Sequence, residues 1–478
     1  MRMRAVALPT STAVVGVAGL NAGLALILAE RGATSSALLA LLPLMIVLFG
    51  MLVVSNRTVL LAAALGLNMT VPALQKPLPL PGGQLYGADI VVILAVVAWL
   101  ARRLTLPAEA RPRSPTSPLL GPPLILFAAA ATWAALRGHY DYGANVFGQP
   151  LRLFAYVLLV FAFVDLNPRT TYRTIVAVFY ALTVWMFLNA VYYSVSGASQ
   201  TNQIDLSTGG KRVLALSTAI YLAGGLFLAL LNLEMDGSAK RRAIHLLIAA
   251  LALAGIIVAY GRATYLAVAL VVPALFVLLP RLRRALFSML PICIPFILLL
   301  AIALPRVAPS VEPTLTNRVL KSNGSDVNVQ WRQEAAGALW QQVHESPITG
   351  VGFGKSATFR FNGVQQTINQ DPHDSFLYLL AGGGILTLCG FLLLMLTFAV
   401  DAVMRLRRAT DPYQRLIVLW SMATLCAFLV NAAASPVLSD PRMLLTIWAV
   451  LLLPSSIRPA ASEAVTPTRA PAPSPQAV

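Results

Sequence analysis

Three side chains in this sequence have types and positions that suit chemistry on an anion. Arg262 stands between two apolar runs with almost no loop, Arg332 lies in a long polar stretch, and His373 directly precedes the next apolar run. The planar guanidinium of arginine binds phosphate oxygens through paired hydrogen bonds and can stabilise charge as a phosphate leaves. A neutral histidine can take a proton from an attacking hydroxyl. Together the three residues predict a site for an anionic substrate.

Each of these side chains also fits a plainer interpretation. The guanidinium of Arg262 can reach lipid phosphates at a membrane surface, Arg332 fits a solvated surface charge, and His373 fits a polar residue at the membrane interface. Lys211 and Arg212 open another apolar run and fit interfacial anchors better than substrate contacts. These alternatives stay open on the sequence alone.

Clustered metal ligands do not accompany these residues in the sequence. The polar stretch contains no Asp-x-Asp pair, and the chain has no His-x-x-His or His-Glu-x-x-His motif. We therefore expect a site without a metal or another cofactor. Residues 350–356, Gly-Val-Gly-Phe-Gly-Lys-Ser, look like a nucleotide-binding loop, but that motif requires glycine at position 349, which is threonine. We reject nucleotide binding at this segment.

The elements that must position these residues are membrane-spanning helices. Hydrophobic residues make up 58% of the 478 residues and charged residues only 11%, whereas a soluble domain carries roughly 25% charged residues. Apolar runs of about 20 residues, the length that crosses a bilayer as a helix, recur along most of the chain. We predict an all-α polytopic transmembrane bundle of about 12 to 14 spans. These spans are expected at 12–29, 35–54, 58–75, 87–101, 119–136, 150–166, 173–194, 213–233, 244–260, 262–279, 286–305, 375–400, 416–433 and 441–454.

The basic residues predict which side of the membrane the polar stretch occupies. The net charge is +17, and the tight basic clusters all fall on one side if the N-terminus is inside and the span number is even. Lysine and arginine in short loops mark the cytoplasmic side. The polar stretch is then extracytoplasmic, and the protein lies in the cytoplasmic (inner) membrane. Because the chain shows neither a basic soluble domain nor an aromatic-basic surface, we do not expect it to bind nucleic acid.

This topology divides the chain into four parts. They are residues 1–305 with about 11 spans and a Pro- and Arg-rich cytoplasmic linker near 102–118, the large extracytoplasmic loop 306–374, the last spans in 375–454, and a disordered cytoplasmic tail 455–478. Loops as long as the extracytoplasmic one are usually functional. Within it, the spacing of apolar residues predicts an amphipathic helix over 330–345, which Pro347 would end.

The order of these features resembles the O-antigen ligase and O-antigen polymerase family of glycan-transferring membrane enzymes. The resemblance covers about 240–400 in detail. Its pieces, in chain order, are Gly261-Arg262 at the junction of two spans, a long outer loop with Trp331-Arg332 in a helix, Pro347, the turn Gly350-Val351-Gly352-Phe353-Gly354, His373 where the chain re-enters the membrane, and Gly382-Gly383-Gly384-Ile385 in the next span.

The resemblance implies a GT-C-like glycosyltransferase that needs no metal. It would take a glycan from an undecaprenyl diphosphate carrier and pass it to an acceptor hydroxyl on the outer face of the membrane. Carried over residue by residue, Arg262 and Arg332 would hold the lipid diphosphate, His373 would activate or position the acceptor, and Arg212 with Lys211 would contact the substrate. The implied partners are the lipid-linked glycan donor, a lipid or glycan acceptor, membrane lipids and other polysaccharide-assembly proteins.

In one position the chain departs from the family pattern. The family often has His-Asn where this chain has His373-Asp374. Adjacent helical residues do not face each other, so we do not expect Asp374 to serve His373 directly. This difference affects the expected acceptor preference and the exact reaction more than it affects the resemblance to the family.

Two other classes of function compete with the enzyme. A transporter or flippase for a lipid-linked anion is expected to carry ionisable or helix-breaking residues near the middle of several spans. The predicted spans are instead mostly Ala, Leu and Val, and the polar residues gather in one loop. A non-catalytic scaffold of an envelope-polymer machine is a third interpretation. The residues do not distinguish a ligase from a polymerase.

Overall fold

The computed structural model describes the parts of the chain that surround the predicted site. These are residues 57–67, 78–80, 83–105, 119–143, 149–161, 163, 166–196, 214, 216–235, 237–259, 261–284, 287, 327–368 and 373–457. The predicted spans 12–29 and 35–54 lie outside the described residues, as do Lys211, Arg212, the cytoplasmic linker beyond Thr105 and the tail beyond Ile457. Span 286–305 lies outside them except for residue 287.

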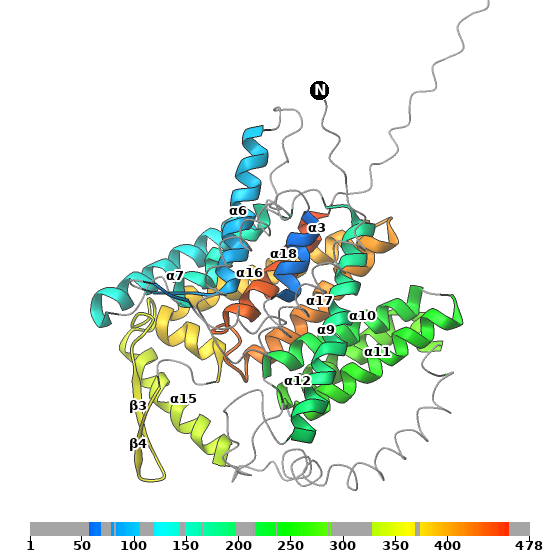
Figure 1. The fold of residues 1–478 in the computed structure, drawn as a ribbon. Coiled ribbons are helices and arrows are strands. Elements are labelled where there is room, and N and C mark those ends of the chain that lie inside the picture. The colour runs from blue at the N-terminus through cyan, green and yellow to red at the C-terminus, as the bar shows by residue number, and fades with distance from the viewer. Residues whose placement is uncertain are drawn as a thin grey trace, which may run out of the picture.

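Helices form most of the described chain (Figure 1). They are α3 Arg57–Ala62, the π-helix η1 Ala63–Leu67, α6 Gly87–Thr105, α7 Gly121–Tyr142, α8 Gln149–Ala155, the 3-10 helix η3 Tyr156–Phe161, α9 Pro168–Ser196, α10 Leu216–Met235, α11 Ala239–Val258, α12 Arg262–Leu278, α15 Val327–Glu345, α16 Ser375–Arg408, α17 Pro412–Ala432 and α18 Pro441–Ser456. Two antiparallel hairpins join them: β1 Leu78–Leu80 with β2 Gly83–Leu85, and β3 Ala357–Phe361 with β4 Val364–Ile368.

The helices confirm an all-α polytopic membrane protein. Among the described residues, α9, α10, α11, α16 and α17 are long and apolar enough to cross a membrane.

In the described part of the chain, three predicted spans differ from a single regular α-helix. In span 58–75, α3 ends at Ala62 and the chain continues as the π-helix η1. In span 375–400, α16 has non-helical backbone angles at Gly384. Residues 150–166 are the third case. The α-helix α8 ends at Ala155, and the chain continues as the 3-10 helix η3.

The bundle core is built around α10, which is buried on all sides from Thr218 to Leu233. A helix that is apolar all round belongs in the interior of a bundle. The indole of Trp420 on α17 packs edge-on against Phe179 on α9, with ring centroids 4.9 Å apart. The same indole donates a hydrogen bond of 3.0 Å to the carbonyl of Gly224 on α10. This residue therefore ties three helices together at the centre.

A second hydrophobic core lies at one edge of the bundle, where α15 and the β3–β4 hairpin pack beside the start of α16 (Figure 1). It is made by Ala335, Ala338, Leu339, Val343, Ala357, Phe359, Ile368, Leu377 and Ala381. The predicted helix over 330–345 is therefore present as α15, with Trp340 on its half-exposed side. We call α15, the hairpin and residues 375–383 of α16 the loop unit.

The hairpin follows from local sequence. Along β3, Ala357 and Phe359 are buried and Thr358 and Arg360 are exposed, which is the alternation of a strand with one covered face. Asn362 and Gly363 connect the strands with φ angles of 49° and 78°. Asn-Gly is the preferred pair for a two-residue turn with both φ angles positive.

Candidate functional site

Arg262 is the first residue of α12 and is half-buried. In the first turn of the same helix, the hydroxyl of Thr264 donates a hydrogen bond of 2.9 Å to Oδ1 of Asn431 on α17. Asn431 in turn donates to the carbonyl of Ala427 over 2.8 Å, so its amide is held in one orientation. These bonds fix the start of α12, and with it Arg262, at the C-terminal end of α17.

The start of α16 is fixed at the same end of α17. The hydroxyl of Ser375 donates to the carbonyl of Ser435 over 2.9 Å and accepts from the backbone N–H of Leu438 over 3.3 Å. Ser435 and Leu438 lie in the short connection between α17 and α18. Since Asn431 and Ser435 are four residues apart, the start of α12 at Arg262 and the start of α16, two residues after His373, are both anchored at this end of α17.

His373 has an unusual backbone for a residue with a side chain. Its φ angle is 59°, in the left-handed region, which histidine enters more readily than most residues but still at an energetic cost. Such strain gathers at active sites and switches. Its imidazole packs edge-on against Trp331, with ring centroids 5.8 Å apart, and its Nδ1 atom is buried. The ring is therefore held by the surrounding structure rather than free to rotate in solvent.

Arg332 follows Trp331 on α15 and is half-buried. Trp331 contacts Phe359 of β3 on one side, with ring centroids 5.5 Å apart, and His373 on the other. The second hydrophobic core thus places the N-terminal turns of α15 beside the start of α16. The structure brings Trp331 and His373 into contact and anchors Arg262 near the same helix start, whereas Lys211 and Arg212 lie outside the described residues.

Asp374 caps α16. Its Oδ1 accepts hydrogen bonds from the backbone N–H groups of Phe376, over 2.9 Å, and Leu377, over 3.1 Å. Burial raises the pKa of this carboxyl, and the two backbone hydrogen bonds oppose that rise. The side-chain oxygen of asparagine is as good a helix cap as that of aspartate. An asparagine at position 374 would therefore keep this capping role.

The helix α16 is broken at Gly384, where φ is 68° and ψ is −174°. Residues 346–354, which we call the glycine turn, insert at this break. The N–H groups of Val351 and Gly352 donate to the carbonyls of Ala381 and Gly382, over 3.0 and 2.9 Å. On the other side of the break, Ile385 and Leu386 donate to the carbonyls of Pro347 and Ile348, over 2.9 and 3.3 Å.

These four bonds replace two bonds of an unbroken helix. In regular α-helix geometry Ile385 would donate to Ala381, and Leu386 to Gly382. Backbone groups at membrane depth must be bonded within the protein, and non-helical backbone is tolerated there only where protein covers it. The glycine turn meets that requirement, so the break in α16 is a stable feature.

Glycine is required where the two segments touch. A Cβ atom added to Gly350 would lie 2.3 Å from the carbonyl oxygen of Gly382, and one added to Gly384 would lie 2.2 Å from that of Ile348. Both glycines also have φ angles near 70°, which favour glycine. Two separate glycine-rich pieces of the sequence resemblance therefore meet in space.

The sequence reasoning missed Arg137, near the C-terminal end of α7. Its Nη1 donates to the carbonyl of Gly350 over 2.5 Å, to the hydroxyl of Ser346 over 3.1 Å and to that of Thr349 over 3.4 Å. Its Nε pairs with Asp141 at 3.4 Å. The available signal was the dipeptide Arg137-Gly138 just after an apolar run, the reverse of Gly261-Arg262.

Two further arginines are held by carboxylates. Arg152, 5% exposed, forms a two-pronged pair with Asp89 over 2.7 and 2.8 Å. Arg442 forms the same kind of pair with Asp440, over 2.8 and 2.7 Å. Because each guanidinium already has a two-pronged partner, we assign these residues to the stability of the bundle.

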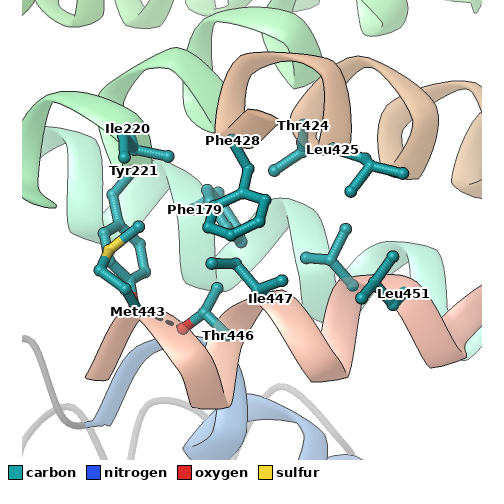
Figure 2. Close-up of a pocket in the computed structure, with 11 residues that line it drawn as sticks. Phe179, Ile220, Tyr221, Thr424, Leu425, Phe428, Met443, Thr446, Ile447 and Leu451 are labelled. Carbon is teal, nitrogen blue, oxygen red and sulfur yellow. Dashed lines mark hydrogen bonds between the residues drawn. The ribbon is translucent and has the colours of Figure 1, made fainter. Parts of the chain in front are cut away.

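An apolar pocket lies deeper in the bundle, between α9, α10, α17 and α18 (Figure 2). Its lining residues include none of the predicted site residues. The hydroxyls of Tyr221 and Thr446 on its wall bond to one another. The walls of this pocket do not suit an anion.

Within the described ranges, no three histidine, cysteine, aspartate or glutamate residues lie together in a group that could hold a metal ion. Independence of a metal stays a prediction.

Comparison with protein families places part of this site in a known family. A family model described as O-antigen ligase matches residues 247–392. The matched segment begins in α11, includes α12, the loop helix and the hairpin, and ends in α16 beyond its break. It contains Arg262, Arg332 and His373. No curated protein matches the chain.

Proposed function

We propose, from the match of residues 247–392 to the O-antigen ligase family model, that this multi-pass membrane protein transfers a glycan from an undecaprenyl diphosphate carrier to an acceptor hydroxyl. The acceptor oxygen bonds to the anomeric carbon of the sugar, the bond from that carbon to the diphosphate breaks, and undecaprenyl diphosphate leaves. The proposal rests on the helix starts carrying Arg262 and His373, anchored four residues apart at the end of α17, and on the ring contact between Trp331 and His373.

The arginines act on the leaving diphosphate. As the sugar–oxygen bond breaks, negative charge grows on the phosphate oxygens, and a fixed guanidinium stabilises that charge more than it stabilises the intact donor. Arg262 and Arg332 are half-buried and lie on two different helices. They can therefore approach a diphosphate from two directions.

His373 acts on the acceptor. Its imidazole takes the proton of the acceptor hydroxyl as the new bond forms, or orients that hydroxyl for attack. The left-handed backbone and the packing against Trp331 hold the ring in place before the substrate arrives. Such preorganisation lowers the cost of reaching the reactive geometry.

The chemistry takes place on the extracytoplasmic face of the cytoplasmic membrane. The positive-inside charge pattern supports this placement, because the basic loop clusters lie on the opposite side of the predicted spans. Lys211 and Arg212 are proposed as additional contacts to the anionic donor on that face.

The alternative function is a transporter, and the break in α16 is the structural feature that could support it. Broken helices in transporters leave backbone groups free to coordinate an ion or a substrate. In this chain the glycine turn occupies the backbone groups on both sides of Gly384. The break therefore favours a structural role over transport.

The test is glycan transfer by purified protein with an undecaprenyl-diphosphate-linked glycan and candidate acceptors. We expect Arg262→Ala, Arg332→Lys and His373→Asn each to reduce turnover by at least about 100-fold, the scale of losing one positioned donor or base. Lysine keeps the charge of Arg332 but not its planar fork, and asparagine tolerates the left-handed backbone of His373.

Arg407→Lys is the matched control, because Arg407 is exposed in the last turn of α16 and should keep full activity. Full activity in two of the three site variants would refute the site. In a strain that lacks the gene, accumulated single repeat units would identify a polymerase, and unattached long chains would identify a ligase.

A further inference from the structure

We propose that Arg137 is a positioning residue of the candidate site. Its guanidinium holds the glycine turn against α7, and the turn in turn sets where His373 and Arg332 stand. This inference rests on the proposed function, and its test includes a measurement that does not depend on glycan transfer.

The contact between Arg137 and the turn is built from several bonds. One guanidinium nitrogen donates to three acceptors, of which the closest is the carbonyl of Gly350 at 2.5 Å. Directly beside it, the N–H of Phe353 donates to the carbonyl of Ala134 over 3.1 Å. A Cβ atom on Gly138 would lie 1.8 Å from the carbonyl oxygen of Phe353, so α7 and the turn touch through their backbones.

The glycine turn is also the point where the two arms of the site meet. The arm α15 ends at Glu345, immediately before the turn, and the other arm is residues 375–383 of α16, which end at the break the turn fills. At their far ends the arms meet again through the Trp331–His373 ring contact. The turn therefore forms an apex that joins the two arms at the end opposite to the predicted site residues.

The lengths of the arms show how a small movement is amplified. Arg332 lies thirteen residues before the last residue of α15, which is about 20 Å at 1.5 Å per residue. Arg137 is thus too distant to donate a hydrogen bond to a diphosphate bound at Arg332. A tilt of a few degrees at the apex moves the far end of α15 by about 1 Å, and an error of that size can lower a rate by about 100-fold.

The variants separate the hydrogen bonds of Arg137 to the glycine turn from its positive charge and from its ion pair with Asp141. Arg137→Gln removes the charge and the three bonds, whereas Arg137→Lys keeps a cation and donors. Asp141→Asn is the matched control, because it weakens the ion pair on Nε and leaves the bonds of Nη1 to the turn. The double variant Ser346→Ala, Thr349→Ala instead removes the two hydroxyl acceptors of Arg137 from the glycine turn.

We expect Arg137→Gln to lower kcat by about 10- to 100-fold per folded molecule, with the KM for the donor changed by less than about 3-fold. Arg137→Lys should recover part of kcat, and Asp141→Asn should match the wild type. When Arg137→Gln is combined with Ser346→Ala and Thr349→Ala, the loss of kcat should be smaller than the product of the losses caused by Arg137→Gln alone and by the Ser346 and Thr349 pair alone. The reason is that both sets of substitutions remove the same hydrogen bonds.

The independent readout is the distance between spin labels at Thr367, exposed on β4, and Arg407, exposed at the end of α16. Labels are attached to Thr367→Cys and Arg407→Cys in a chain whose Cys293, Cys389 and Cys426 are replaced by serine. Arg137→Gln should shift or broaden this distance, and Asp141→Asn should not.

An unchanged distance in Arg137→Gln overturns the inference, whether or not the wild type transfers a glycan. A shifted distance with wild-type kcat also overturns it, because the contact would then be structural only. If the wild type is inactive towards every donor and acceptor tested, the proposed function fails. The distance measurement then still decides whether Arg137 positions the loop unit.

Discussion

Replacing Gly384 with alanine should cost the protein a large share of its stability. The backbone at Gly384 has φ 68° and ψ −174°, a region that is occupied almost only by glycine. Forcing a residue with a side chain into it costs about 1–3 kcal/mol. The added methyl group would also lie 2.2 Å from the carbonyl oxygen of Ile348, so the glycine turn must move away.

That movement breaks hydrogen bonds as well. Four backbone bonds join the turn to the two halves of α16, and each buried group left without its partner costs about 1–3 kcal/mol. If two of the four are lost, the total reaches roughly 3–9 kcal/mol, against a typical folding stability of about 5–15 kcal/mol. We expect the melting temperature in detergent to fall by about 3–9 °C, because the entropy of unfolding is about 1 kcal/mol per kelvin for a chain of this length.

The matched control is Gly337→Ala in α15. Gly337 is exposed on a helix, and a Cβ atom there meets nothing within 4 Å. Alanine should therefore stabilise the helix by about 0.5–1 kcal/mol. If Gly384→Ala melts within about 2 °C of the wild type while Gly337→Ala behaves as expected, the glycine turn does not lock into the helix break and the reasoning is wrong.

Three further predictions concern the surroundings of the site. Burial raises the pKa of Asp374 above its ordinary 3.8, so any stability from this carboxyl is fully present below pH 3.8 and is lost as pH rises through the raised value. Asp374→Asn, which keeps the cap, should therefore melt higher than the wild type at pH 7 and equally at pH 3.5; a constant difference would contradict this. Thr264→Val leaves Oδ1 of Asn431 without this donor and should cost about 1–3 kcal/mol; an unchanged melting curve would show that the bond is not important. EDTA should leave glycan transfer intact, and strong inhibition that added metal reverses would refute a metal-free reaction.

The sequence predicted the helices of the bundle well because a membrane helix satisfies its own backbone. The helix expected over 262–279 is α12, Arg262–Leu278, and the one expected over 330–345 is α15, Val327–Glu345. In both helices, the spacing of the apolar residues and the type of residue at one end were enough to predict the helix. The change from α-helix to 3-10 helix within 150–166 could not be predicted in this way, because the residues on both sides of the change are mostly apolar.

The β3–β4 hairpin was missed although its signal is local. Asn362-Gly363 between alternating exposed and buried residues is a recognised turn pattern, so the sequence itself was sufficient to predict this hairpin. The docking of the glycine turn into α16 is different in kind. It depends on backbone groups about 35 residues apart, and no spacing rule links them.

The site residues were predicted by type and position, and their roles stay predictions. The sequence places Arg262 and His373 at the starts of helices, and the structure adds the hydrogen bonds of Thr264 and Ser375 that bring those starts together. Arg137 escaped notice because an arginine at a helix end looks the same whether it binds lipid, a substrate or a neighbouring turn. Only the three-dimensional contact distinguishes these cases.

The break in α16 also constrains the order in which the chain can be assembled. The glycine turn is synthesised before α16, so the four bonds that join them can form only after the chain has been extended past Leu386. Without the turn, the backbone groups beside Gly384 lose these partners. A chain that lacks residues 346–354 should therefore be defective in the folding of α16 as well as in the folding of the loop unit.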